Sequence, residues 1–155
     1  MVDSPRVDTS QHIVTQSLAA FVAREGRPSQ GELVVVGCSG GQDSTALLAA
    51  LAESGLGPLV AVYVDHGLRQ GTQAEADLVA RHALRLGARS TSVRVLVEPR
   101  GNLLARAREA RYRALAGIAV GEGARLVAVG HTASDQAETA CFRAARGDPW
   151  PAFAG

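Results

Sequence analysis

Six residues near the start of the chain, Ser39-Gly40-Gly41-Gln42-Asp43-Ser44, combine the groups that a protein uses to hold phosphate. Paired glycines permit a tight turn and close approach to an anion, and the free N–H groups of a helix's first turn point at that anion. The hydroxyls of Ser39 and Ser44 can donate hydrogen bonds to phosphate oxygens, and the Asp43 carboxylate can hold Mg²⁺. The pattern predicts a phosphate-binding loop.

The segments that flank this loop favour that interpretation over a simple capped turn. The apolar run 33–36 is typical of a short buried strand, and 44–51 is typical of the start of a helix. A Walker A loop would end in Gly-Lys-Ser or Gly-Lys-Thr. All 16 basic residues of this chain are arginines, so a Walker-type kinase or GTPase is excluded.

Composition indicates one ordinary globular domain. With 155 residues, 46% hydrophobic and 20% charged, the chain is long enough to bury a sizeable core.

Nine arginines fall between Arg81 and Arg113. Their distribution suits either a nucleic-acid-binding surface or solvated helix faces, and charge alone favours solvated helix faces. The two cysteines, Cys38 and Cys141, form no C-x-x-C motif, which predicts a reducing cytoplasm and argues against a cysteine-bound metal. No apolar run is long enough to span a bilayer.

Alternating strand and helix patterns predict an α/β fold: a doubly wound, mainly parallel sheet with helices on both faces. Expected strands cover about 32–37, 59–64, 91–97 and 125–130, and expected helices cover about 10–25, 44–54, 72–87, 103–120 and 134–146. The predicted domain covers 10–147. Residues 1–9 are expected to be a disordered tail, and 148–155 a short tail at a truncation point.

Polar residues cluster immediately after three of the expected strands. The loop follows the first strand, 65–69 (Asp-His-Gly-Leu-Arg) follows the second, and 131–139 follows the fourth. Ligands in such sheets bind beyond the carboxyl ends of the strands. We therefore expect these three clusters to share one edge of the sheet. Asp135 and Glu138, one turn apart on the expected last helix, would lie on one face.

With these segments in order, the sequence resembles the tRNA(Ile)-lysidine synthetases, a family of the PP-loop (N-type ATP pyrophosphatase) superfamily with the adenine nucleotide alpha-hydrolase-like fold. The resemblance rests on Ser39–Ser44, on 64–69, on Ala-Arg-Glu-Ala-Arg-Tyr at 107–112 and on Gly-His-Thr-Ala-Ser-Asp-Gln-Ala-Glu-Thr at 130–139. It implies an ATP- and Mg²⁺-dependent ligase. Such an enzyme adenylates the C2 oxygen of the wobble cytidine in tRNA(Ile) with a CAU anticodon, and free L-lysine then displaces AMP.

The resemblance also implies roles for particular residues. Asp43 would hold the metal, and Asp43, Arg111, Asp135 and Glu138 would be catalytic, with the two acids facing the lysine amine. The residues implied for ATP binding are Ser39, Gly40, Gly41, Gln42, Asp43, Ser44, Val64, His66 and His131. Those implied for tRNA or lysine are Arg69, Arg108, Arg111, Asp135 and Glu138.

Three departures from the family pattern keep alternatives open. Ser134 stands where the family usually has a second acid, Leu104 stands where it often has a glutamate, and Arg146-Gly147 leads into Asp148 in place of the usual glycine-rich segment. The chain is then either a fragment or a natural protein reduced to the nucleotide domain, and we expect the 155-residue form alone to be weak or inactive. The alternatives are another PP-loop ATP pyrophosphatase and a truncated ATP-binding module without turnover. A homodimer is a further candidate assembly.

Overall fold

The computed structural model describes residues 16, 31–68, 72–97, 101–133 and 136–143. The elements are β1 (Val34–Gly37), α2 (Gln42–Ser54), β2 (Leu59–Asp65), α3 (Thr72–Arg85), β3 (Arg89–Arg94), α4 (Leu103–Glu122), β4 (Leu126–Ala133) and β5 (Gln136–Arg143). The expected tails and nearly all of the expected helix 10–25 lie outside the described residues. None of the described helices combines the length and apolarity that a membrane crossing requires.

The five strands form one sheet in the order β3-β2-β1-β4-β5. The first four strands are parallel, and β5 runs antiparallel to β4. Val35 of β1 pairs with Val60 on one side and Val127 on the other, so β1 lies at the centre of the parallel part. The doubly wound, mainly parallel fold expected from the sequence is confirmed.

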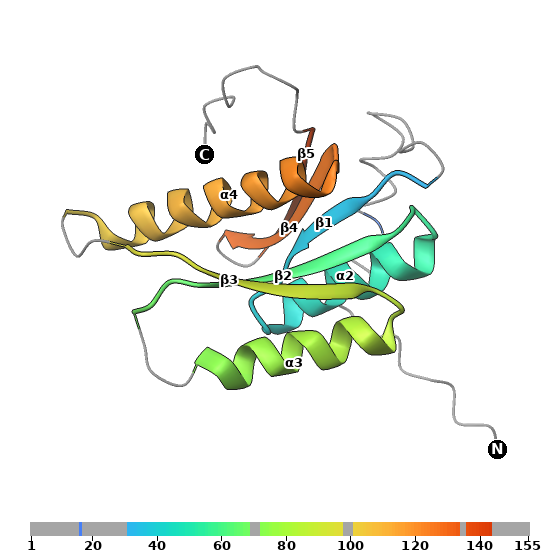
Figure 1. Cartoon of the computed structure of the whole chain (residues 1–155), viewed down its shortest axis with the longest axis horizontal. Helices are drawn as coiled ribbons and strands as arrows, with labels where there is room; N and C mark the ends of the chain where they lie inside the picture. The colour runs from blue at the N-terminus through green and yellow to red at the C-terminus, as the bar shows by residue number, and fades with distance from the viewer. Residues whose placement is uncertain (1–15, 17–30, 69–71, 98–100, 134–135, 144–155) are drawn as a thin grey trace.

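Helices cover both faces of this sheet (Figure 1), with α4 on one face and α2 and α3 on the other. Alternate residues of β1 therefore belong to different cores. Val34 and Val36 pack with α2 and α3, whereas Val35 packs with Leu115 of α4. This two-sided burial explains why the central strands are continuous apolar runs with no polar alternation.

Helix ends follow local chemistry. The Asn102 side chain accepts a hydrogen bond from the Ala105 N–H at 3.2 Å and caps the start of α4. Gly123 ends the same helix with φ of 69°, a left-handed conformation that glycine adopts without strain.

The expected last helix at 134–146 is wrong: residues 136–143 form β5. Every β4 residue from Leu126 to Ala133 has a partner on β5, running from Arg143 back to Gln136. This pairing satisfies backbone groups along an edge of β4 that would otherwise stay open, and β-branched and aromatic residues such as Thr139 and Phe142 suit a strand. Glu138 therefore lies on a strand, and its helical spacing from Asp135 does not apply.

The third strand also differs from the expected range of 91–97. β3 covers 89–94, and its Arg89, Ser90, Thr91 and Ser92 are exposed. It is the edge strand beside β2, so it is not buried on both faces as the central strands are. The chain leaves the strand at Val95, whose N–H still donates to the Asp65 carbonyl at 2.8 Å.

The core beneath α4 gives a direct test of this architecture. Leu115 is fully buried between α4 and the sheet, whereas Leu84 on α3 is 79% exposed. We expect Leu115→Ala to lower the free energy of unfolding by about 2–5 kcal/mol, because it leaves a cavity in a packed layer. Leu84→Ala is the matched control, and its change should stay within about 0.5 kcal/mol. Urea unfolding followed by circular dichroism measures both, and equal effects would contradict the described packing.

Candidate active site at the ends of β1 and β4

The loop after β1 presents the open N-terminus of α2. Gly40 has φ of +80°, a left-handed conformation that suits glycine. Gly41 is the N-cap residue of α2, and no side chain caps the helix there. The N–H groups of the first helical turn therefore remain available, and they carry the positive end of the helix dipole. This arrangement suits an anion.

Two serine hydroxyls lie together at this helix start. The Ser44 hydroxyl donates to the Gly41 carbonyl at 3.1 Å and accepts from the Ser39 N–H at 3.2 Å. The Ser39 and Ser44 hydroxyl oxygens are 3.3 Å apart. Ser44 is buried and Ser39 exposed, so the pair runs from the protein interior to its surface. The sequence therefore builds a preorganised hydroxyl pair within reach of the helix N-terminus.

A cavity of about 170 Å³ opens beside this loop. It lies where β1 and β4 are neighbours while α2 and α4 pack on opposite faces, which is the switch point at which doubly wound sheets bind ligands. The volume is below the roughly 300–1,000 Å³ of complete small-molecule sites, so the described residues form only part of a pocket of that size. The lining residues are Gly37, Cys38, Ser39, Ser44, Val62, Tyr63, Val64, His66, Glu75, Arg111, Val129 and Gly130.

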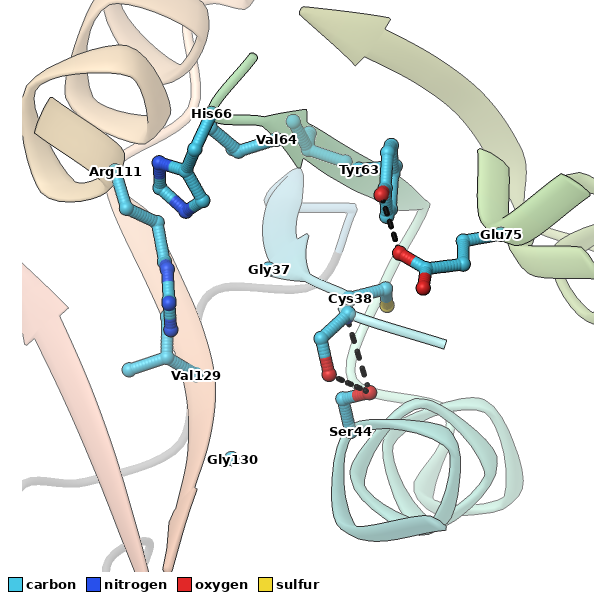
Figure 2. Close-up of a pocket in the computed structure, with 12 residues that line it drawn as sticks. Gly37, Cys38, Ser44, Tyr63, Val64, His66, Glu75, Arg111, Val129 and Gly130 are labelled. Atoms are coloured by element: carbon cyan, nitrogen blue, oxygen red, sulfur yellow. Dashed lines mark hydrogen bonds between the residues drawn. The ribbon is translucent and has the colours of Figure 1, made fainter. Parts of the chain in front are cut away.

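One wall of the cavity is formed by His66, after β2, and Arg111 of α4 (Figure 2). Burial lowers the pKa of His66 below its usual value, the Arg111 charge lowers it further, and Asp65 acts in the opposite direction. Within the described part of the chain, His66 Nδ1 is buried and has no hydrogen-bond partner. The His66 ring is therefore neutral at pH 7, and it lies beside the Arg111 guanidinium, which stays positively charged.

The turn that carries His66 is fixed by Asp65. Its carboxylate accepts the Gly67 N–H at 2.9 Å and lies 3.5 Å from Arg94 Nε. The pKa of Asp65 is lowered, first by the Gly67 hydrogen bond and then by Thr72, Arg94 and His66, against a smaller opposing effect of burial. The acid of the 65–69 cluster thus shapes the turn and directs the next residue to the cavity.

The opposite wall contains a pair that sequence reasoning missed. The Tyr63 hydroxyl donates to Glu75 Oε2 at 2.6 Å, which ties β2 to the first turn of α3 (Figure 2). A Cβ placed on Gly40 would lie 3.8 Å from the Glu75 carbonyl oxygen, so the loop packs against the same turn. The only signal in the sequence was an aromatic hydroxyl in a buried strand, which needs a polar partner.

Cys38 lies at the floor of the site and was not predicted there. It is 6% exposed, and burial raises the pKa of its thiol to about 12. The thiol therefore stays protonated at neutral pH in the ligand-free site.

Gly130 allows β4 to approach the start of α2. A Cβ at this position would lie 3.2 Å from the Asp43 carbonyl oxygen and 3.3 Å from Ser44 Cα. Those are backbone atoms, so they cannot turn aside as a flexible side chain would. The first turn of α2 can therefore lie this close to β4 only because residue 130 is a glycine.

Comparison with known proteins agrees with this geometry, since residues 10–155 match the PP-loop domain family. The chain belongs to that family. It is 47% identical over 118 residues to a tRNA(Ile)-lysidine synthase of Mesorhizobium japonicum, covering 72% of this chain and 26% of that protein. It is 48% identical over 124 residues to the synthase of Salinispora tropica, covering 74% and 36%. The chain thus spans about a quarter to a third of the length of these curated relatives.

A solved structure supports the fold. The chain resembles a U34-tRNA thiolase of Methanococcus maripaludis with a TM-score of 0.66 at 18% identity, covering 79% of this chain and 46% of that one. At this identity the likeness concerns the PP-loop fold alone.

The structure brings several predicted site residues of this PP-loop domain together. Five of them line the cavity: Ser39, Ser44, Val64, His66 and Arg111. The others of the loop, Gly40, Gly41, Gln42 and Asp43, form the turn and the first turn of α2 beside it. Their roles in binding remain predictions.

The remaining predicted residues lie elsewhere or outside the described chain. Arg108 is exposed, with its guanidinium carbon 5.7 Å from the centroid of the Tyr112 ring, and it does not line the cavity. His131 of β4 and Glu138 of β5 are register partners. Arg69 and Asp135 fall outside the described residues.

Gly130 yields a test of how the site is positioned. We expect Gly130→Ala to weaken ATP binding by about fivefold or more, because the added methyl group displaces the first turn of α2. Gly121→Ala on α4, where a Cβ meets nothing within 4 Å, is the matched control and should leave affinity unchanged. Calorimetric titration with ATP measures both variants. Wild-type affinity in a folded Gly130→Ala protein would contradict the proposed dependence.

Proposed function

We propose that this chain is the ATP-binding, adenylating part of a tRNA(Ile)-lysidine synthase. The observation that carries the proposal is the PP-loop itself: an uncapped α2 N-terminus with paired serine hydroxyls, facing His66 and Arg111 across one cavity. The 47% and 48% identities to curated lysidine synthases support the choice of this reaction among PP-loop chemistries.

ATP would lie with its β,γ-pyrophosphate on the loop. The first-turn N–H groups of α2 and the hydroxyls of Ser39 and Ser44 are donors suited to phosphate oxygens. The adenosine part would lie near Val64 and His66, at the end of β2, with His131 as a further proposed ATP contact. In this position the pyrophosphate is bound as a leaving group.

Mg²⁺ fits the residues present. Magnesium in nucleotide sites uses one or two carboxylates together with substrate phosphates. The described residues contain no cluster of three or more His, Cys, Asp or Glu that could hold a metal by themselves. Asp43, in the first turn of α2, is the carboxylate next to the proposed phosphate position. It would hold the ion, which when bound neutralises charge on the phosphates.

The proposed reaction has two steps. The C2 oxygen of the wobble cytidine attacks the α-phosphorus, the bond to the bridging oxygen breaks, and pyrophosphate leaves. The amine of lysine then attacks C2, AMP leaves with the former cytidine oxygen, and the amine loses a proton to a base. Arg69, Arg108 and Arg111 are proposed tRNA contacts. Asp135 and Glu138 are proposed to bind the amine and accept its proton.

A cytoplasmic location accords with this reaction and is part of the proposal. Lysine as co-substrate, tRNA(Ile) with a CAU anticodon as acceptor and a homodimer as assembly stay proposals as well.

Asp43 provides the test of the metal role. Asp43→Ala should weaken Mg²⁺-dependent ATP binding by about ten- to a hundredfold, because a charge-assisted contact is lost. Asp77→Ala on α3 removes an equal charge from an exposed residue whose described partner is Gln73, and it should bind ATP normally. Calorimetry with and without Mg²⁺ separates the two. Equal affinity of Asp43→Ala and the wild type would exclude the metal role.

The reaction itself is tested by product formation. With ATP and tRNA(Ile) of CAU anticodon, the chain should release AMP and pyrophosphate in a lysine-dependent manner, and other tRNAs should give little. Glu138→Gln should keep ATP affinity while reducing lysine transfer, since its proposed partner is the amine, and Glu53→Gln on α2 is the control. The 155-residue chain should be much less active than a longer form that spans its curated relatives.

Two outcomes favour the other readings. Pyrophosphate release that ignores tRNA would indicate a different PP-loop enzyme. ATP binding without AMP formation, even in the longer form, would indicate a nucleotide-binding module without turnover.

A further inference from the structure

We propose that Glu75, held in place by the Tyr63 hydroxyl, is a positioning residue for the phosphate-binding loop: it supports the glycine turn of the loop from outside and so sets how tightly pyrophosphate binds there. Neither side chain was assigned to the site from the sequence. The inference rests on the proposed ATP binding and adds to it two residues that act through the loop and not on the ligand.

The loop is braced internally by its own hydroxyl groups. The Ser44 and Thr45 hydroxyls both donate to the Gly41 carbonyl, at 3.1 and 2.9 Å. The Gly41 N–H lies 3.4 Å from the Ser39 hydroxyl, to which it donates. These bonds join one loop residue to another, so they shape the turn. They do not fix its place in the domain, which therefore depends on packing against neighbouring elements.

The glycine turn faces the first turn of α3. A Cβ placed on Gly40 would lie 3.8 Å from the Glu75 carbonyl oxygen, 3.9 Å from Glu75 Cβ and 3.9 Å from Leu78 Cδ2. On the other side of the loop, β4 lies against the backbone of Asp43 and Ser44. The loop is thus held between β4 and α3, and Glu75 is the α3 residue nearest to Gly40.

The Tyr63 hydroxyl fixes this part of α3. Tyr63 is 5% exposed and belongs to the core between the sheet and helices α2 and α3, together with Val79 and Ala83. Its hydroxyl donates to Glu75 Oε2 at 2.6 Å (Figure 2). Glu75, Val79 and Ala83 follow one another at intervals of four residues, which places them on one face of the helix. A carboxylate thus continues the buried face of α3 and meets a donor from a packed core.

The charge of Glu75 argues against a direct role in binding phosphate. Glu75 lines the same cavity as Ser39 and Ser44, and a negative charge beside a bound anion weakens its binding. A carboxylate is, however, a strong acceptor for a phenolic hydroxyl. The hydrogen bond to Tyr63 therefore accounts for an acid at this position, and Glu75 acts on the loop.

Binding of inorganic pyrophosphate with Mg²⁺, measured by calorimetric titration of the 155-residue chain, tests the inference. Tyr63→Phe should weaken pyrophosphate binding by about three- to tenfold, because the hydrogen bond that holds Glu75 is lost. Glu75→Gln and Glu75→Met both remove the charge, but only glutamine keeps an acceptor for the hydroxyl. Glu75→Gln should bind at least as tightly as the wild type, and Glu75→Met about three- to tenfold more weakly than Glu75→Gln.

A control separates positioning from a general loss of stability. Leu59 lies at the other end of β2 and belongs to the same core as Tyr63. Leu59→Ala should lower the free energy of unfolding and leave the pyrophosphate affinity of the folded protein unchanged. In ¹H–¹⁵N correlation spectra, the amide signals of Gly40 and Gly41 should shift in Tyr63→Phe and stay in place in Leu59→Ala.

Three results would overturn the inference. They are wild-type pyrophosphate affinity in a folded Tyr63→Phe protein, equal affinities of Glu75→Met and Glu75→Gln, and weaker binding by Glu75→Gln than by the wild type. The last would mean that the charge of Glu75 matters, as it would for a metal ligand. In each case, binding of ATP and pyrophosphate by the wild type would leave the proposed function intact. A wild-type chain that binds neither would overturn the proposed function as well.

Discussion

The first turn of α2 lies directly on the backbone of β4, and the rest of the site is arranged around that contact. It is possible because residue 130 has no side chain, which leaves Asp43 and Ser44 within van der Waals reach of the strand. The contact aims the helix N-terminus along the end of β1. Arg111 comes from α4, which packs on the other face of the same two strands, and with His66, which follows β2, it faces the loop across the cavity.

The positive groups of the site and its hydrogen-bonded carboxylate lie on different walls of the cavity. Arg111 and the end of the α2 dipole are positive, and His66 is held neutral by its burial and by Arg111. The carboxylate at the cavity, Glu75, accepts the Tyr63 hydroxyl and lies against the loop's glycine turn. An anion entering the cavity would therefore find donors on two sides and a hydrogen-bonded carboxylate on the third.

The local sequence pattern was sufficient to predict the strand, loop and helix start that build this site. The apolar run of β1, the paired glycines and the start of α2 are consecutive in the chain, and the structure places them as expected. Tertiary contacts were harder to predict. Tyr63 and Glu75 are 12 residues apart and meet only because α3 folds back on β2. Residues 136–143 were expected to be helical from the spacing of Asp135 and Glu138, but antiparallel pairing with the preceding strand β4 outweighs that preference.

The outer edge of the sheet bears on how readily a strand of another molecule could pair with it. Among the described residues β3 is an edge strand, with Arg89 at one end and Arg94 at the other, and exposed Ser90, Thr91 and Ser92 lie between them. Arg89 is held by Glu122 of α4 at 2.7 Å, so the charge stays at the strand's start. A strand of another molecule added to this edge would meet two ion-paired arginines and a run of exposed polar side chains. The composition of β3 thus disfavours pairing between sheet edges, which a more apolar strand would promote.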